Sequence, residues 1–264
     1  MSDVLMKEMK DGLLVLTMNR PESRNALDPT LTRALLDAAA EAAEDPAVRA
    51  VLLRGAGGHF CVGGDVKAMN QGQGRDLSLG ERIHSLRDRM SVSQYLHDMP
   101  KPTIALIEGS CAGAGLSVAL SCDLRICAED AKIVTAFAKV GLSGDFGGTC
   151  FLTRILGAAR ARELYLTSPV LSGREAAGIG LVTRAVPAAE VEEAAMTLAA
   201  SLAGGPTLTY GRIKQNIALA EGGGTLSACL DQEARNHILS STTADHKEAA
   251  AAFVEKRKPV FTGR

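Results

Sequence analysis

Three short apolar runs, separated by segments with helical spacing, constrain most strongly what this chain can fold into. Each run is almost wholly apolar, as expected of strands buried on both faces, and the runs are Leu13–Met18, residues 48–54 and Thr103–Ile107. After the first run, Asp28 and Pro29 precede apolar residues at three-to-four spacing, which predicts a helix with an N-cap and a first-turn proline. A strand, a helix and a strand in this order are typical of parallel βαβ units, so we predict an α/β fold.

The chain changes character near Ala203. Strand-like runs stop there, and three helical patterns follow, over residues 206–220, 225–240 and 243–257. The pair Gly204-Gly205 precedes the first of these patterns, and the triplet Gly222-Gly223-Gly224 separates the first from the second. We therefore expect a core formed by residues 1–203 and a helical C-terminal region formed by residues 204–264.

The overall charge disfavours polyanionic partners, although it does not exclude a local basic patch. The 29 Lys and Arg residues nearly balance the 30 Asp and Glu residues, and the net charge of -1 offers no electrostatic reason to bind nucleic acid or a membrane surface. The 264 residues, 46% of them hydrophobic, can bury a substantial core.

A polar, glycine-containing stretch at residues 71–76 predicts a mobile surface loop that flanks a binding site.

The cysteines and the N-terminus indicate a cytoplasmic protein. The six cysteines form no CxxC pair and mostly have small or apolar neighbours, which predicts buried, reduced thiols and a reducing compartment. The first twelve residues lack the apolar segment of a signal peptide, and the most apolar window, residues 103–120, contains Glu108. We therefore expect no signal peptide and no membrane span.

Two glycine-rich segments, residues 57–69 and 108–116, follow predicted strands. Bare backbone N–H groups at the carboxyl ends of strands lie where ligands bind in α/β sheets. Two such donors that converge would stabilise an oxyanion, because fixed dipoles need no reorganisation when charge develops. Glycine clusters at strand-to-helix turns also serve as close-packing devices, so the residues alone leave both interpretations open.

A third glycine-rich stretch, V-G-L-S-G-D-F-G-G-T at residues 140–149, surrounds the single carboxylate of Asp145. An aspartate among turn residues is commonplace, because its side chain can hydrogen-bond its own backbone. The alternative is that Asp145 is the acid/base group of an active site. Nearby Phe137 and Phe146 would desolvate the carboxylate and raise its pKa.

Several short motifs occur in a fixed order along the chain. They are Asn19-Arg20-Pro21 with Asn25-Ala26-Leu27, F-C-V-G-G-D-V-K-A-M at residues 60–69, Lys101-Pro102 before Glu108-Gly109, Gly113-Ala114-Gly115 with Cys122-Asp123, Val140-Gly141-Leu142, Gly147-Gly148-Thr149, and F-V-E-K-R-K-P at residues 253–259. Each motif alone is common. In this order and at these spacings, the chain resembles the enoyl-CoA hydratase/isomerase (crotonase) superfamily along nearly its whole length.

The resemblance implies a spiral of ββα units followed by a C-terminal helical trimerisation region, with assembly as a homotrimer or a dimer of trimers. It also implies an acyl-CoA substrate whose thioester carbonyl is held by two backbone N–H groups, which here belong to Gly64 and Ala114. Coenzyme A is then part of the substrate. We expect no separate cofactor and no metal.

The resemblance also locates the acid/base groups. In similar hydratases two glutamates handle water and the proton, and their positions fall here on Ser117 and Phe137. Phenylalanine transfers no proton, and a serine hydroxyl is too weak to replace a carboxylate unaided. Asp145 falls where isomerases of the superfamily have an aspartate. We therefore predict that Asp145 acts as base and then acid, and isomerises an unsaturated or ring-modified acyl-CoA.

Three alternatives stay open at this point. The chain could be an enoyl-CoA hydratase in which Asp145 activates water, a thioester hydrolase, or an acyl-CoA-binding module without catalysis. Ser117 could orient substrate or water, although a serine early in a helix more often bonds the backbone. The histidines His84 and His97 are expected to be packed or solvated, and Glu108 is expected to be non-catalytic.

The resemblance assigns coenzyme A binding to two segments, largely through backbone groups. Their residues are Arg24, Asn25 and Ala26 in the first, and Gly63, Asp65, Val66 and Lys67 in the second. Ser117 and Phe137 are expected to line the acyl site. Arg24, or Lys256 and Lys258 from a neighbouring subunit, could reach a phosphate, since their side chains suit phosphate oxygens.

Overall fold

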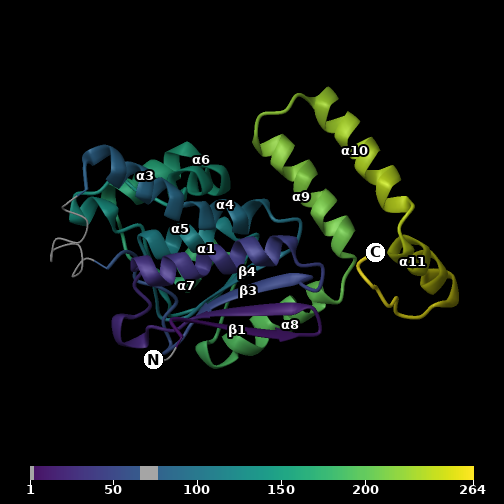
Figure 1. Cartoon of the computed structure of the whole chain (residues 1–264), viewed down its shortest axis with the longest axis horizontal. Helices are drawn as coiled ribbons and strands as arrows, with labels where there is room; N and C mark the ends of the chain where they lie inside the picture. Colours follow the sequence, from purple (N-terminus) through teal and green to yellow (C-terminus); the bar gives the residue numbers. More distant parts are fainter. Residues whose placement is uncertain (1–2, 66–76) are drawn as a thin grey trace.

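The computed structural model describes residues 3–65 and 77–264. A layered α/β core carries an arm of three helices, α9 to α11, that extends away from it (Figure 1). The loop predicted over residues 71–76 lies outside the described residues, as do Val66 and Lys67. Within the described part of the chain, no helix is long and apolar enough to cross a membrane.

The core contains a six-stranded and a three-stranded sheet. The larger has the order β1-β2-β3-β4-β6-β9, and all of its pairs are parallel except β1 with β2. Its strands are β1 Leu5–Lys10, β2 Leu13–Met18, β3 Ala50–Gly55, β4 Thr103–Ile107, β6 Leu124–Ala128 and β9 Arg184–Val186. The smaller has the order β5-β7-β8, with β5 Ser110–Ala112, β7 Lys132–Val134 and β8 Leu171–Ser172.

Helices cover both faces of the larger sheet (Figure 1). The helices of the core are α1 Pro29–Glu44, α3 Leu79–Arg89, α4 Ser91–Asp98, α5 Ala114–Ser121, α6 Gly148–Thr167, α7 Gly173–Gly178 and α8 Val191–Ala203. Those of the arm are α9 Thr207–Glu221, α10 Leu226–Ser241 and α11 Ala244–Glu255. Short 3-10 helices occur at η1 Pro21–Ser23, η2 Phe137–Val140 and η3 Ala188–Glu190.

Successive turns of the chain repeat one pattern. After β4 the chain enters β5 of the small sheet and then α5, and after β6 it enters β7 and then η2 and α6. Equivalent strands of the two turns pair in parallel, β4 with β6 and β5 with β7. This stacking of ββα turns confirms the predicted spiral and brings the loops that follow each strand to one region.

Strands and helices with strong patterns agree with the sequence predictions. The strands β2 and β4 have the predicted bounds, and α1 begins after Asp28, whose carboxylate accepts a hydrogen bond from the Leu31 N–H at 2.8 Å. The three helices of the arm confirm the C-terminal prediction. The small-sheet strands were not predicted, since two or three residues are too few to establish a period.

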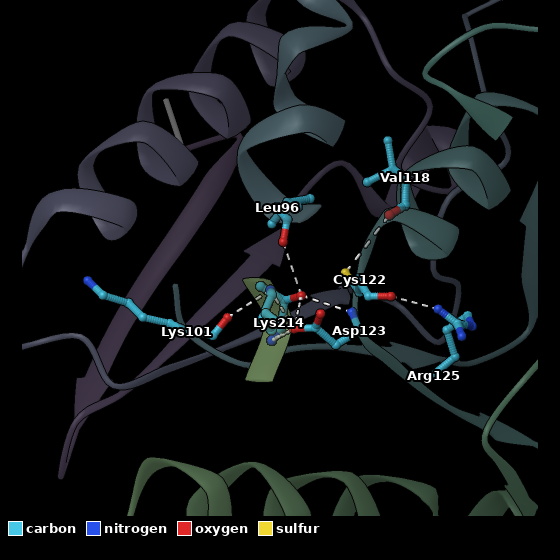
Figure 2. Close-up of polar contacts among 8 residues, drawn as sticks. Leu96, Lys101, Val118, Cys122, Asp123, Arg125 and Lys214 are labelled. Carbon is cyan, nitrogen blue, oxygen red and sulfur yellow. Dashed lines mark hydrogen bonds and ion pairs between the residues drawn. The ribbon is translucent and has the colours of Figure 1, made fainter. Parts of the chain in front are cut away.

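One carboxylate joins the core to the arm. Asp123 accepts hydrogen bonds from the Thr103 N–H at 2.8 Å and the Thr103 hydroxyl at 3.0 Å, at the start of β4. The Lys214 ammonium, on α9, donates to the same carboxylate at 2.7 Å and to the Lys101 carbonyl at 3.1 Å (Figure 2). The Lys214 side chain is 16% exposed, so this ion pair is shielded from solvent.

Replacing this carboxylate should destabilise the fold. Asp123→Ala removes three acceptor contacts and leaves the Lys214 charge unpaired, so we expect a loss of about 2 to 4 kcal/mol in the free energy of unfolding. Urea denaturation measures it. The control is Asp37→Ala in the exposed Arg33–Asp37 pair, with an expected change of about 0.5 kcal/mol or less. Equal effects of the two substitutions would contradict this role of Asp123.

Candidate active site

The two glycine-rich segments after β3 and β4 run side by side. The Cys61 N–H donates to the Ser110 carbonyl at 3.1 Å, and the Ala112 N–H donates to the Cys61 carbonyl at 2.9 Å. A Cβ placed on Gly115 would lie 2.4 Å from the Cys61 carbonyl oxygen. Glycine is therefore required for close packing here, and the same packing brings the backbone N–H groups of both segments together.

Gly63 packs against the residues that lead into α5. A Cβ on Gly63 would lie 3.3 Å from the Ala114 nitrogen. Ala114 is the first residue of α5, so its N–H has no carbonyl partner within the helix. Leu27 and Gly64 form a parallel β-bridge. The Leu27 N–H donates to the Gly63 carbonyl, and the Asp65 N–H donates to the Leu27 carbonyl. In such a bridge the N–H of Gly64 points away from Leu27.

The predicted coenzyme A segments also lie beside one another. The Val62 N–H donates to the Arg24 carbonyl at 3.2 Å, and the Leu27 N–H donates to the Gly63 carbonyl at 2.8 Å. Arg20, which was not predicted as a site residue, holds this corner by ion pairs of 3.4 Å to both Asp28 and Asp65. Of the predicted binding residues, Val66 falls outside the described ranges.

Asn25 supports the first segment with its side chain. Its carboxamide oxygen accepts from the Arg20 N–H at 2.9 Å, and its nitrogen donates to the Ala56 and His59 carbonyls at 2.9 and 2.7 Å. The side chain is fully buried, and the backbone has a positive φ of 57°. Its amide is thus committed to the loop, while the neighbouring Arg24 is exposed and Ala26 is buried.

Asp145 lies in the loop between η2 and α6. Its backbone carbonyl accepts from the Gly148 N–H at 3.1 Å, so the stretch is a turn. Its side-chain Oδ1 is buried and has no hydrogen-bond partner among the described residues. Burial raises the pKa of the Asp145 carboxyl to about 6, and the charge of Arg89 opposes this shift. The direction agrees with the sequence-based expectation.

Tyr165 packs under this loop, a contact that the sequence did not predict. A Cβ on Gly144 would lie 3.2 Å from its ring, and a Cβ on Gly148 would lie 2.6 Å from its hydroxyl and 2.2 Å from the Ser117 hydroxyl. The ring also stacks on Phe137, with centroids 5.9 Å apart. Tyr165 and Ser117 therefore leave no room for side chains at Gly144 and Gly148.

Two groups near Asp145, the Tyr165 phenol and the Cys61 thiol, stay neutral at physiological pH. Burial raises the pKa of the Tyr165 phenol to about 12; a contact with the Ser117 hydroxyl lowers it and the charge of Asp145 raises it. Burial likewise raises the pKa of the Cys61 thiol to about 12, with a further increase from Asp145. Asp145 is therefore within electrostatic reach of the Cys61 segment, and Cys61 is poorly suited to be a thiolate nucleophile.

Two of the remaining candidates, His97 and Glu108, have structural partners. The His97 ring lies 5.1 Å from that of Phe151, and Glu108 pairs with Arg54 at 3.6 Å. His84 is on an exposed turn of α3. A pocket of about 610 Å³, lined by His97, Phe151 and Lys214 among others, lies between the core and α9, and Asp145 does not line it.

Comparisons with known proteins agree with this geometry. Residues 8–264 match the family model described as enoyl-CoA hydratase/isomerase. The chain is 37% identical to the 1,2-epoxyphenylacetyl-CoA isomerase of Escherichia coli K12, with complete coverage of both chains. It is 38% identical to a protein of Rhodobacter capsulatus named "Probable enoyl-CoA hydratase", with 97% of each covered.

A solved structure extends the similarity to three dimensions. The crystal structure of an enoyl-CoA hydratase from Polaromonas sp. JS666 superposes with a TM-score of 0.90 at 32% identity, covering 97% of this chain and 99% of that one. The chain belongs to the enoyl-CoA hydratase/isomerase family and has the crotonase fold. The predicted family and fold are therefore confirmed.

The buried carboxylate should make stability depend on pH. The folded-state pKa of Asp145, about 6, is above the unfolded value, so the folded state binds the proton more tightly and is favoured at low pH. That stability is lost as pH rises through about 6. Wild type should therefore lose stability relative to Asp145→Asn between about pH 4 and 6 in urea denaturation.

Asp130→Asn is the control for this measurement, because the Asp130 side chain is exposed. The difference in unfolding free energy between wild type and Asp130→Asn should stay nearly constant over the same range. A difference between wild type and Asp145→Asn that does not change with pH would show that the Asp145 carboxylate is not desolvated in the folded protein.

Proposed function

We propose that this protein isomerises an unsaturated or ring-modified acyl-CoA, with Asp145 as the proton-transferring group. The observation that carries the proposal is a half-buried carboxylate whose pKa is raised to about 6, near neutral pH. A general base is most effective when its pKa lies near the operating pH. Tyr165 and Ser117, which lie beside it, are neutral hydroxyls and cannot take over this task.

The proposed reaction begins with removal of a proton from the acyl chain by Asp145. The electron pair moves toward the thioester carbonyl, whose oxygen becomes an enolate. The N–H groups of Gly64 and Ala114 would stabilise this oxygen, with roughly 3 to 4 kcal/mol from each well-placed donor. Asp145 then returns the proton to a different carbon, and no water is consumed.

The surroundings of Asp145 support transfer between carbons. Phe137 and Phe146 are each 5% exposed, and the Tyr165 ring stacks on Phe137. Apolar side chains keep the carboxylate poorly solvated in its charged form, which strengthens it as a base. The name of the Escherichia coli relative, an isomerase of a ring-epoxide acyl-CoA, supports the same reaction class.

Hydration of a 2-enoyl-CoA is the second candidate. The name of the Rhodobacter capsulatus relative favours it. The hydroxyls of Ser117 and Tyr165, which both approach Gly148, are groups that could bind a water molecule beside Asp145. In that reaction Asp145 alone would activate the water.

A homotrimer or a dimer of trimers is part of the proposal. The arm exposes large apolar side chains that a partner would cover, among them Ile217, Ile238, Phe253 and Val254. Phe253 is 85% exposed, which is costly for an isolated chain. Two further statements stay predictions. One is that Arg24, or Lys256 and Lys258 of a neighbouring subunit, binds a phosphate of coenzyme A, and the other is that the protein is cytoplasmic.

Deuterium uptake tests the proposed chemistry. Wild type incubated with 3-enoyl-CoA in heavy water should move the double bond without hydration, and deuterium should enter where the proton on Asp145 exchanges with solvent before it is returned. Asp145→Asn should lower this rate by about 10² to 10⁴, since a positioned acid/base group contributes that much. Affinity for the acyl-CoA, measured by calorimetry, should change little, because asparagine has nearly the same shape.

Asp130→Asn, at an exposed carboxylate, controls for general effects of losing one charge. Turnover that survives Asp145→Asn would overturn the assignment of the base. Hydration of 2-enoyl-CoA by wild type, with no migration of the double bond, would favour the second candidate instead.

A further inference from the structure

Ser117 contacts the peptide unit that carries one of the proposed oxyanion donors. Its hydroxyl donates to the Gly113 carbonyl at 3.3 Å, and its backbone N–H donates to the same oxygen at 3.0 Å. The Gly113 carbonyl and the Ala114 N–H belong to one planar amide. A group that binds the carbonyl therefore acts directly on the orientation of the N–H.

The orientation of this amide depends on an unusual backbone conformation. Gly113 has φ 52° and ψ -125°, a combination that side chains other than glycine rarely adopt. The amide is not held by a preceding turn of helix, because Ala114 is the first residue of α5. Two hydrogen bonds on one carbonyl fix the plane, and they also polarise the N–H on the opposite side of the amide.

The Tyr165 hydroxyl lies close to that of Ser117. A Cβ on Gly148 would lie 2.6 Å from the Tyr165 hydroxyl oxygen and 2.2 Å from the Ser117 hydroxyl oxygen, so the missing side chain of Gly148 leaves room for both. The Tyr165 ring is in turn held by its stack on Phe137, whose Cζ would lie 3.9 Å from a Cβ on Gly113. Contacts therefore lead from Tyr165 to Gly113 on two sides, through a hydroxyl and through an aromatic ring.

We propose that Ser117 is a positioning residue that orients and polarises the Ala114 N–H toward the thioester oxygen, and that the Tyr165 hydroxyl supports it. Neither side chain transfers a proton in this role. The inference rests on the proposed function, in which Ala114 is an oxyanion donor. It assigns to the hydroxyl of Ser117 a contribution to the strength of that donor.

The infrared stretch of a bound thioester carbonyl tests the inference without turnover. The probe is butanoyl-CoA labelled with ¹³C at the thioester carbonyl. Bound to wild type, its stretch should shift to lower frequency than in water, because the hydrogen bonds weaken the carbonyl. In Ser117→Ala part of this shift should be lost. Tyr165→Phe, which keeps the stacked ring, should lose a smaller part.

Ser121→Ala is the matched control. Ser121 is also on α5 and buried, but its hydroxyl donates to the Val118 carbonyl at 2.7 Å, away from the Gly113 amide. The Ser121→Ala substitution should leave the carbonyl shift unchanged.

In turnover assays, Ser117→Ala should lower kcat/KM by about 3- to 10-fold, because loss of one neutral hydrogen bond has an effect of this size. Most of the change should be in kcat.

The outcomes separate the two claims. A wild-type protein that does not shift the carbonyl stretch, or does not bind butanoyl-CoA, would contradict the proposed oxyanion site and the inference with it. A wild-type shift that is fully retained in both Ser117→Ala and Tyr165→Phe would leave the oxyanion site standing and overturn the role of Ser117.

Discussion

The close approach of two backbone segments, residues 61–64 and 110–115, is the contact on which the rest of the site depends. The segments exchange main-chain hydrogen bonds of 3.1 and 2.9 Å, and a side chain at Gly63 or Gly115 would collide with the opposite segment. The spiral makes this approach possible, because β4 pairs in parallel with β3 and the segments that follow these two strands meet at the Cys61–Cys111 bridge. The glycines are therefore required by packing, and the same packing places the first N–H of α5, that of Ala114, next to Gly63.

Close packing also shapes the Asp145 loop, in this case against side chains rather than against another backbone segment. Tyr165 and Ser117 fill the space beside Gly144 and Gly148, so the loop passes over them without side chains of its own at these positions. The carboxylate between these glycines is left half-buried, with one oxygen that no described group satisfies. An unsatisfied, desolvated carboxylate costs stability. Such a cost is typical of positions kept for chemistry rather than for folding.

Much of the fold could be predicted from the sequence, and less of the site. The buried strands β2 and β4 and the capped helix α1 have strong local patterns, and they occur where the patterns predict them. The short strands of the small sheet depend on contacts between turns of the spiral, which leave no period in two or three residues. Only the resemblance to the family, which implies ββα units, predicted that such strands exist.

Tyr165 shows why the site was harder to predict. It follows Asp145 by 20 positions, on a helix whose regular spacing is broken at Gly157, where φ is 76° and ψ is 160°. Helical periodicity counted from Gly148 therefore does not indicate which side chain returns beneath the loop. The roles of Arg20 and Asn25 in shaping the predicted coenzyme A segments are likewise set by groups that are distant in sequence, which are the Asp65 carboxylate for Arg20 and the Ala56 and His59 carbonyls for Asn25.

The central claim is that a desolvated Asp145 carboxylate moves the proton. The most direct test is the pH dependence of kcat/KM for double-bond migration in an enoyl-CoA substrate. The rate should rise with pH through an apparent pKa of about 6 and then level, since the base must be ionised. A rate that stays constant between about pH 5 and 8 would contradict the assignment of Asp145, because a base with this pKa changes its charge within that range.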